Sequence, residues 1–140
     1  MADDSLTIAY RAARYEVRLP DQRVSLQVDA PSEPLRRWLR AQGHRCAALL
    51  TAHNPASQLH DAAVNAQAQR QLQAAIHARG LAFHAGCNLD PQGIWPAEDS
   101  LLVPDLSLED ARALALRFGQ RAFLWCDASG TPRLHETRPA

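Results

Sequence analysis

The chain has 140 residues, which is enough for one domain with one hydrophobic core. Fifteen basic and fifteen acidic residues give zero net charge, and this balance argues against nucleic acid or an anionic membrane as partner. No apolar run approaches the ~20 residues that span a bilayer, and residues 1–5 are too polar for a signal sequence. We therefore expect one cytoplasmic domain over residues 1–140, with its core at about 8–136 and loose ends at 1–6 and 137–140.

The composition also limits the chemistry of any site. All fifteen basic residues are arginine, so no lysine can act as a Schiff base or a general base. Cys46, Cys87 and Cys126 lie far apart in apolar segments, which predicts small buried side chains and neither a disulfide framework nor a zinc knuckle. We expect no metal site and no cofactor.

The first third of the chain predicts a hairpin followed by a helix. Alternating apolar residues in 8–19 change phase once, which indicates a bulge, a break or a short helical turn before a strand. A turn at Pro20-Asp21 and alternation over 24–28 predict the second strand. Ser32 is placed to cap a helix that ends at Gly43.

The middle of the chain predicts a buried strand and a long helix. The apolar run 46–52 is typical of a central strand. The helix is expected from about Ser57 to Arg79, because apolar residues recur at helical spacing. Its expected inner face is formed by Leu59, Ala62, Ala66, Leu72 and Ile76.

The last third of the chain predicts strands at 81–87, 94–103 and 122–126, a helix after Ser107, and a short edge strand near the C-terminus. From Cys46 to Cys126 the order is strand, helix, strand, strand, helix, strand, which is the split βαβ order. The fold class predicted is α+β: one domain with a mixed sheet, three helices and a ferredoxin-like core preceded by a hairpin and a helix.

Two segments place polar residues where a ligand could bind. The segment 51–57 joins a strand to a helix, and such junctions suit anions and polar groups; equally, Asn54 or Ser57 caps the helix. Asn65 lies on or near the helix face that packs on the sheet. An asparagine there needs a hydrogen bond, either to the protein backbone or to a ligand.

Glu98 is the residue best placed for acid–base chemistry. It follows Trp95 and Pro96, so its carboxylate is expected to be partly shielded from water, as a general acid or base requires. In a regular strand Ser100 shares its face. The alternative is a surface carboxylate, or one that ties down a neighbouring loop.

The segments TAHNPAS (51–57), GIWPAEDS (93–100) and FGQRA (118–122), together with Asn65, resemble the bacterial domain of unknown function family 3293 (DUF3293). The resemblance covers roughly residues 10–126, and His53 stands where the family pattern usually has an aromatic residue. It implies a small cytoplasmic bacterial protein and names no activity. The polar positions of the pattern are Asn54, Ser57, Asn65, Glu98, Ser100 and Gln120.

Two hypotheses of different classes follow from these six residues. In the first, they converge at one edge of the sheet and bind a small polar or anionic ligand, with Glu98 as the catalytic residue if the protein is an enzyme. In the second, they are structural, and the protein is a non-enzymatic interaction module or a homodimer that uses an exposed sheet edge or the helix of Trp38. The sequence leaves the ligand, catalysis and oligomeric state open.

Overall fold

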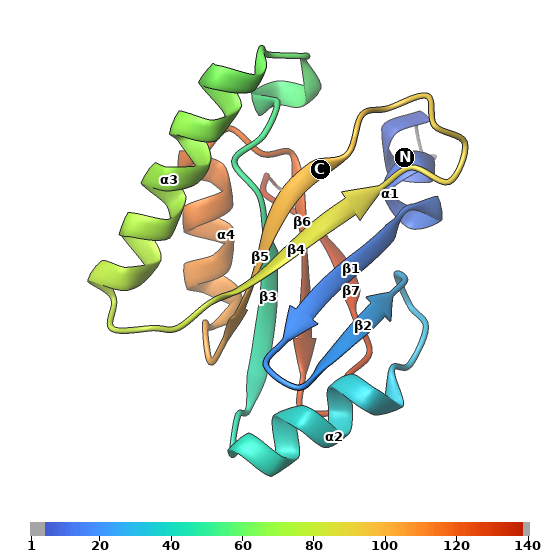
Figure 1. The fold of residues 1–140 in the computed structure, drawn as a ribbon, viewed down its shortest axis with the longest axis vertical. Coiled ribbons are helices and arrows are strands. Elements are labelled where there is room, and N and C mark those ends of the chain that lie inside the picture. The colour runs from blue at the N-terminus through green and yellow to red at the C-terminus, as the bar shows by residue number, and fades with distance from the viewer. Residues whose placement is uncertain (1–4, 139–140) are drawn as a thin grey trace.

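One seven-stranded sheet organises the computed structural model, which describes residues 5–138 (Figure 1). The strands lie in the order β2-β1-β4-β5-β3-β6-β7. In chain order the elements are α1 (Ser5–Ala12), β1 (Arg14–Leu19), β2 (Gln22–Leu26), α2 (Glu33–Gln42), β3 (Cys46–Leu50), the 3₁₀ turn η1 (Pro55–Ser57), α3 (Ala62–Ala78), β4 (His84–Leu89), β5 (Glu98–Pro104), α4 (Leu108–Arg117), β6 (Ala122–Asp127) and β7 (Arg133–Glu136).

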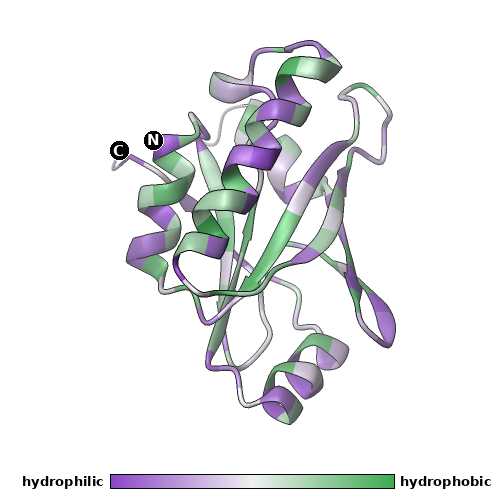
Figure 2. Ribbon diagram, turned by 60° about the vertical axis from the view of Figure 1, so that its left-hand side comes forward, coloured by the Kyte–Doolittle hydropathy of each residue, from purple (hydrophilic) through white to green (hydrophobic). Residues whose placement is uncertain are grey.

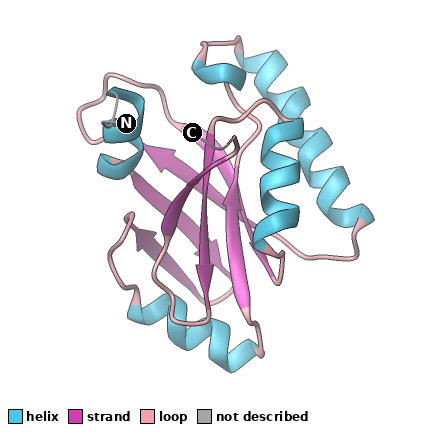
Figure 3. Cartoon of the chain, turned by 180° about the vertical axis from the view of Figure 1, so that it is seen from behind, coloured by secondary structure: helices cyan, strands magenta, loops and turns pink. Residues whose placement is uncertain are grey.

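The sheet has an apolar cluster on each face. On one face α2 inserts Leu35, Trp38 and Leu39 against apolar residues of β1, β2 and the central strands. On the other, α3 and α4 pack side by side (Figure 3), and Leu72, Ile76 and Leu114 meet β3 and β5 there. The central strand β3 serves both clusters and is mostly hydrophobic, whereas the helices carry polar outer faces (Figure 2). The α+β, single-domain prediction is confirmed.

The predicted mixed sheet is wrong, because all of the sheet's pairings are antiparallel. Each helical crossover joins two parallel strands, but another strand lies between them: β5 separates β3 from β4, and β3 separates β5 from β6. Parallel strands are therefore never neighbours. The ferredoxin-like core stays a prediction.

The described residues form four α-helices, not three. The additional helix is α1, which resolves the phase change in 8–19 as a helical segment before β1. None of its residues is buried, so the alternation there did not reflect a sheet face. Tyr15, which is buried in β1, donates from its hydroxyl to the carbonyl of Tyr10 at 2.6 Å and holds α1 in place.

The long helix α3 begins at Ala62, five residues later than the predicted start at about Ser57. Ala56 and Ser57 have positive φ, so the chain makes η1 instead, and Asp61 then caps α3 by accepting from the Val64 N–H. The predicted inner face is wrong in its first half, where Leu59 is 64 % exposed. The buried face of α3 is formed by Asn65, Gln69, Leu72 and Ile76.

The C-terminal segment is tied to the sheet beyond β7. Thr137 is buried, and its hydroxyl donates to the carbonyls of Gln120 and Arg121. Of the segments predicted to be loose, residues 1–4 and 139–140 lie outside the described residues. Among residues 5–138, no helix combines the length and the apolar character that crossing a membrane requires.

The segment between β2 and α2 is fastened to the β6–β7 turn. The Ser32 N–H donates to the Gly130 carbonyl at 3.0 Å, and the Asp29 N–H donates to the Pro132 carbonyl at 2.7 Å. Gly130 has φ +78°, and a Cβ there would lie 2.9 Å from the Arg36 nitrogen and the Ser32 oxygen. Only glycine therefore fits this approach.

We predict that Gly130→Ala lowers the free energy of unfolding by about 1–3 kcal/mol more than Gly43→Ala does, as measured by urea denaturation. Gly43 is the matched control: its φ is +73°, but nothing lies within 4 Å of its added Cβ. Gly43→Ala should therefore lower the free energy of unfolding only by the penalty for a left-handed backbone, about 1–2 kcal/mol. Equal losses for the two variants would show that the contact is not tight.

Candidate functional site

The loop that follows β3 is held together by the hydrogen bonds of one buried asparagine. Asn54 is 4 % exposed and adopts the left-handed conformation, with φ 50° and ψ 60°. Its N–H donates to Asn65 Oδ1 at 2.8 Å, and Asn65 Nδ2 donates back to Asn54 Oδ1 at 2.9 Å. The His60 N–H also donates to Asn54 Oδ1, at 2.9 Å. This reciprocal amide pair joins the loop to the first turn of α3 and satisfies its buried polar groups.

Glu98 fastens the same asparagine to β5. Its Oε2 accepts from Asn54 Nδ2 at 2.7 Å and from the Trp95 indole N–H at 3.0 Å. The Asp90 carboxylate orders the turn before Trp95 by accepting from the N–H groups of Gln92, Ile94 and Trp95. These bonds explain why β5 begins at Glu98 rather than at residue 94: the preceding residues form a turn.

The α4–β6 corner closes over the other side of the loop. Gln120 Nε2 donates to the His53 carbonyl at 3.0 Å, and the Ala56 N–H donates to the Gly119 carbonyl at 2.7 Å. A Cβ on Gly119 would lie 2.8 Å from the Cβ of Pro55. The two segments are therefore in direct contact, with no space between them for a ligand.

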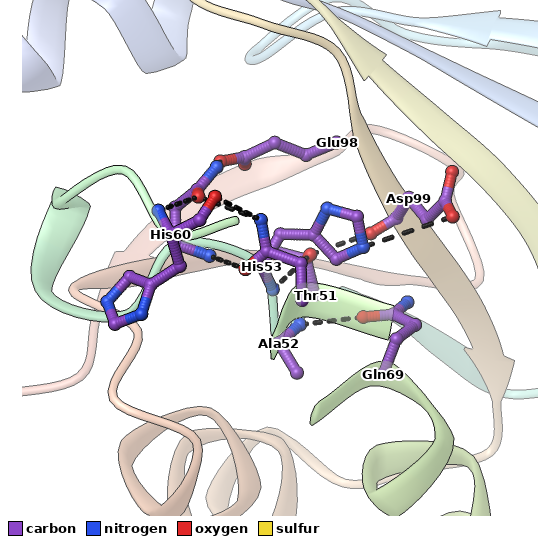
Figure 4. A network of polar contacts seen from close by, with 9 residues as sticks. Thr51, Ala52, His53, His60, Gln69, Glu98 and Asp99 are labelled. Carbon is purple, nitrogen blue, oxygen red and sulfur yellow. Dashed lines mark hydrogen bonds and ion pairs between the residues drawn. The ribbon is translucent and has the colours of Figure 1, made fainter. Parts of the chain in front are cut away.

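The outer face of the loop carries a second set of bonds (Figure 4). Thr51 Oγ1 donates to the Asp99 carbonyl at 2.6 Å and accepts from the His53 N–H at 3.1 Å. His53 Nε2 lies 3.9 Å from Asp99 Oδ2, which is too far for a hydrogen bond. On α3, Gln69 Oε1 accepts from the Ala52 N–H at 2.9 Å. The loop backbone is thus held by two amide side chains of α3, which are separated by a single helical turn.

The structure brings four of the six predicted residues together: Asn54, Asn65, Glu98 and Gln120. Ser57 points elsewhere, and its hydroxyl lies 3.1 Å from the Tyr10 hydroxyl of α1. Ser100 lies deeper in the sheet at 1 % exposure, and its Oγ has no hydrogen-bond partner among the described residues. A Cβ on Gly86, opposite it on β4, would lie 2.8 Å from that Oγ, so the hydroxyl fills the space that the glycine leaves.

The unused hydrogen-bonding capacity around the loop includes a buried amide donor as well as acceptors. The N–H groups of residues 52–54, 56–58 and 60 all donate to protein acceptors, so none of them is left for an anion. Asp61 likewise caps the start of α3. Four buried side-chain atoms of the described residues have no partner: the donor Gln69 Nε2, the acceptor Asn88 Oδ1 opposite Glu98 on β4, Ser100 Oγ and His53 Nε2.

The thiols near the sheet are not activated nucleophiles. Burial raises the pKa of the Cys126 thiol to about 12. The pKa of Cys87 is also raised, by burial and then by the neighbouring Asp99 carboxylate. Cys126 is buried as predicted, whereas Cys46 and Cys87 are only half-buried. His84 stacks edge-on against Trp38, with ring centroids 5.1 Å apart.

No group of three or more metal-ligating side chains lies close enough within residues 5–138 to hold a metal ion. A hollow of about 500 Å³ does exist, but it lies along β2 and the start of α2, and none of the six predicted residues lines it. The motif residues and the hollow are therefore separate features of the molecule.

Sequence reasoning missed several residues that hold the loop. Thr51 and Gln69 were visible next to the motif, but their bonds depend on a loop path that a one-dimensional pattern does not specify. Asp61 carried a signal in the sequence, since an aspartate directly before a helix-forming segment is a common N-cap, and here it accepts from the Val64 N–H.

A comparison with protein-family models matches residues 50–123, just over half of the chain, to the model described as Protein of unknown function (DUF3293). The match spans the end of β3 to the start of β6 and contains the whole loop network. Comparisons with curated proteins and with solved structures found no match.

We predict that Asn65→Ala lowers the free energy of unfolding by about 1–3 kcal/mol, because it leaves the buried Asn54 N–H without an acceptor. Gln71→Ala, an exposed amide on the same helix, is the control and should change it by less than about 0.5 kcal/mol. Chemical denaturation measures both. Equal effects would mean that the Asn54–Asn65 pair contributes nothing measurable.

We predict that Cys126 in the native protein resists iodoacetamide at pH 8, because almost none of its thiol is ionised there. Peptide mass spectrometry after a timed pulse measures the labelled fraction, and labelling in urea provides the unfolded reference. Rapid native labelling of Cys126 would contradict the raised pKa.

Proposed function

Because this chain belongs to the DUF3293 family, whose description names no function, we propose a function from the geometry alone: the protein works as a non-enzymatic protein-interaction module. In this proposal the motif residues are structural: they hold the β3–α3 loop against β5 and the α4–β6 corner. The observation that carries the proposal is the use of their polar atoms. The amides of Asn54 and Asn65 bond to each other and to the backbone.

The position of the hollow supports the same proposal. A ligand site built from the motif needs space beside its side chains, but Gly119 contacts Pro55 directly on one side of the loop. The hollow instead follows β2, an edge strand of the sheet. An open sheet edge is a common docking surface for other chains.

A small-molecule site at the start of β5 is the second candidate. It is favoured by a specific observation: Glu98 uses only Oε2 for its two hydrogen bonds, and Asn88 Oδ1 opposite it has no partner. Two free acceptors suit a small polar ligand that donates hydrogen bonds, and Glu98 would be its catalytic group if a reaction occurs. An anionic ligand has less support here, because the N–H groups of residues 52–54, 56–58 and 60 are already used and Gln69 Nε2 is buried.

A thermal-shift screen with Glu98→Gln separates the two candidates. If Glu98 is structural, the variant melts several degrees lower than wild type, because charge-assisted bonds to Asn54 and Trp95 become neutral ones. In that case wild type shows no shift with amines, guanidines, nucleotides, amino acids, sugars or organic acids. A ligand present at about 100 times its Kd would add about 2.7 kcal/mol, which the screen detects easily.

Glu109→Gln is the control variant, because it removes the same charge from an exposed side chain of α4. It should leave the melting temperature nearly unchanged. A compound that stabilises wild type and Glu109→Gln but not Glu98→Gln would overturn the proposal in favour of the small-molecule site.

A further inference from the structure

The β2 edge of the sheet is open in a way that suits an additional strand. Three consecutive residues of this strand, Arg23, Val24 and Ser25, line the hollow of about 500 Å³. Its far wall is the segment 30–34, which leads into α2. Consecutive residues of a strand point to alternate faces, so a hollow that touches all three runs along the backbone edge itself.

The register of the hairpin shows which backbone groups face that edge. Leu19 and Gln22 flank a two-residue turn and form a hydrogen-bonded pair, so the pairs alternate along the strands from there. Arg23 and Ser25 therefore sit at non-hydrogen-bonded positions opposite Arg18 and Glu16. Their N–H and C=O groups point away from β1, into the hollow, as an added strand requires.

The side chains around this edge are positively charged. Arg14 and Arg23 line the hollow, Arg18 lies opposite Arg23, and none of the three has a carboxylate partner among the described residues. Both oxygens of Glu33, which also lines the hollow, are bound by guanidinium groups of α2. Glu16 accepts from the Ser25 hydroxyl. That bond leaves the negative charge of Glu16 in place, so three arginines outnumber the one carboxylate that lacks a cationic partner within residues 5–138, and this surplus of positive charge favours an acidic occupant.

We propose that the β2 edge binds an extended acidic segment of another protein, which adds to the sheet as an eighth strand and places its carboxylates against Arg14, Arg18 and Arg23. This inference rests on the proposed interaction function and names its partner. A second copy of the same edge would bring these arginines toward arginines and is disfavoured by repulsion. A single small anion would leave the backbone groups of Arg23 and Ser25 unused.

Fluorescence anisotropy with a labelled peptide of about ten residues, alternating Glu and Thr, tests the proposal; this length matches an ordinary strand. The same peptide with Gln in place of Glu is the neutral comparison. We expect the acidic peptide to bind at least about tenfold more tightly than the neutral one, and its binding to weaken when salt rises from about 20 mM to about 200 mM.

Two pairs of variants assign the binding to this edge. Ser25→Pro removes an outward N–H without breaking a bond to β1, so it should lower the affinity for the acidic peptide at least about tenfold. Ser25→Ala keeps the N–H and should bind the acidic peptide nearly as tightly as wild type does. The double variant Arg14→Gln, Arg23→Gln should lower the affinity for the acidic peptide by a similar factor. Its control, Arg40→Gln with Arg45→Gln, makes the same change in net charge at exposed positions elsewhere.

Each contrary outcome is distinct. Unchanged binding by Ser25→Pro, together with full competition by inorganic phosphate, overturns strand addition in favour of a small-anion site. Equal binding of the acidic and the neutral peptide overturns the acidic partner but leaves the interaction function standing. A dimer of the wild-type protein that is seen by light scattering and that Ser25→Pro dissociates has the same two consequences. No binding of either peptide to wild type overturns the inference. The interaction function itself fails only by the small-molecule result described above.

Discussion

The buried left-handed turn at Asn54 constrains how the loop after β3, the start of α3 and the start of β5 fit together. A buried residue in the left-handed conformation cannot use a regular helix or sheet bond for its backbone, so its polar groups need partners from outside the loop. Asn65 supplies both a donor and an acceptor, and Glu98 takes the remaining amide hydrogen bond. This single arrangement sets where α3 begins, where β5 begins, and how the two approach each other.

This constraint changes the meaning of the polar motif. Asparagines and a glutamate that lie at a strand–helix junction invite a functional interpretation, since such junctions often bind ligands. Here the same residues hold a loop that packs directly on the α4–β6 corner, where Gly119 meets Pro55. The family match covers this network and leaves β1 and β2 outside. In our proposal, therefore, the matched segment carries the scaffold, and the β2 edge carries the partner surface.

How well the chain could be interpreted from its sequence differed by element. The helix capped by Ser32 was confirmed, and so was the strand predicted at 46–52, which ends two residues earlier as β3; a capping side chain and a continuous apolar run are local signals. The start of α3 and the first half of its inner face were predicted wrongly, because residues 55–57 form a 3₁₀ turn before the helix; Asn65, Leu72 and Ile76 face the sheet as expected, and Gln69 joins them there. The fourth helix was missed as an element because α1 buries no residue, so no core-facing stripe marks it.

Composition and short-range pattern were enough to predict the α+β class, the single domain and the absence of lysine chemistry, and the resemblance to the family singled out the motif residues. The antiparallel pairing of the whole sheet could be seen only in the folded protein, because it depends on which strand inserts between the two strands that each crossover joins. The tertiary structure also decided that Asn54, Asn65, Glu98 and Gln120 meet, while Ser57 and Ser100 point elsewhere. Side-chain partners 11 to 67 residues apart are set by the packing of whole elements, and no local pattern in the chain encodes them.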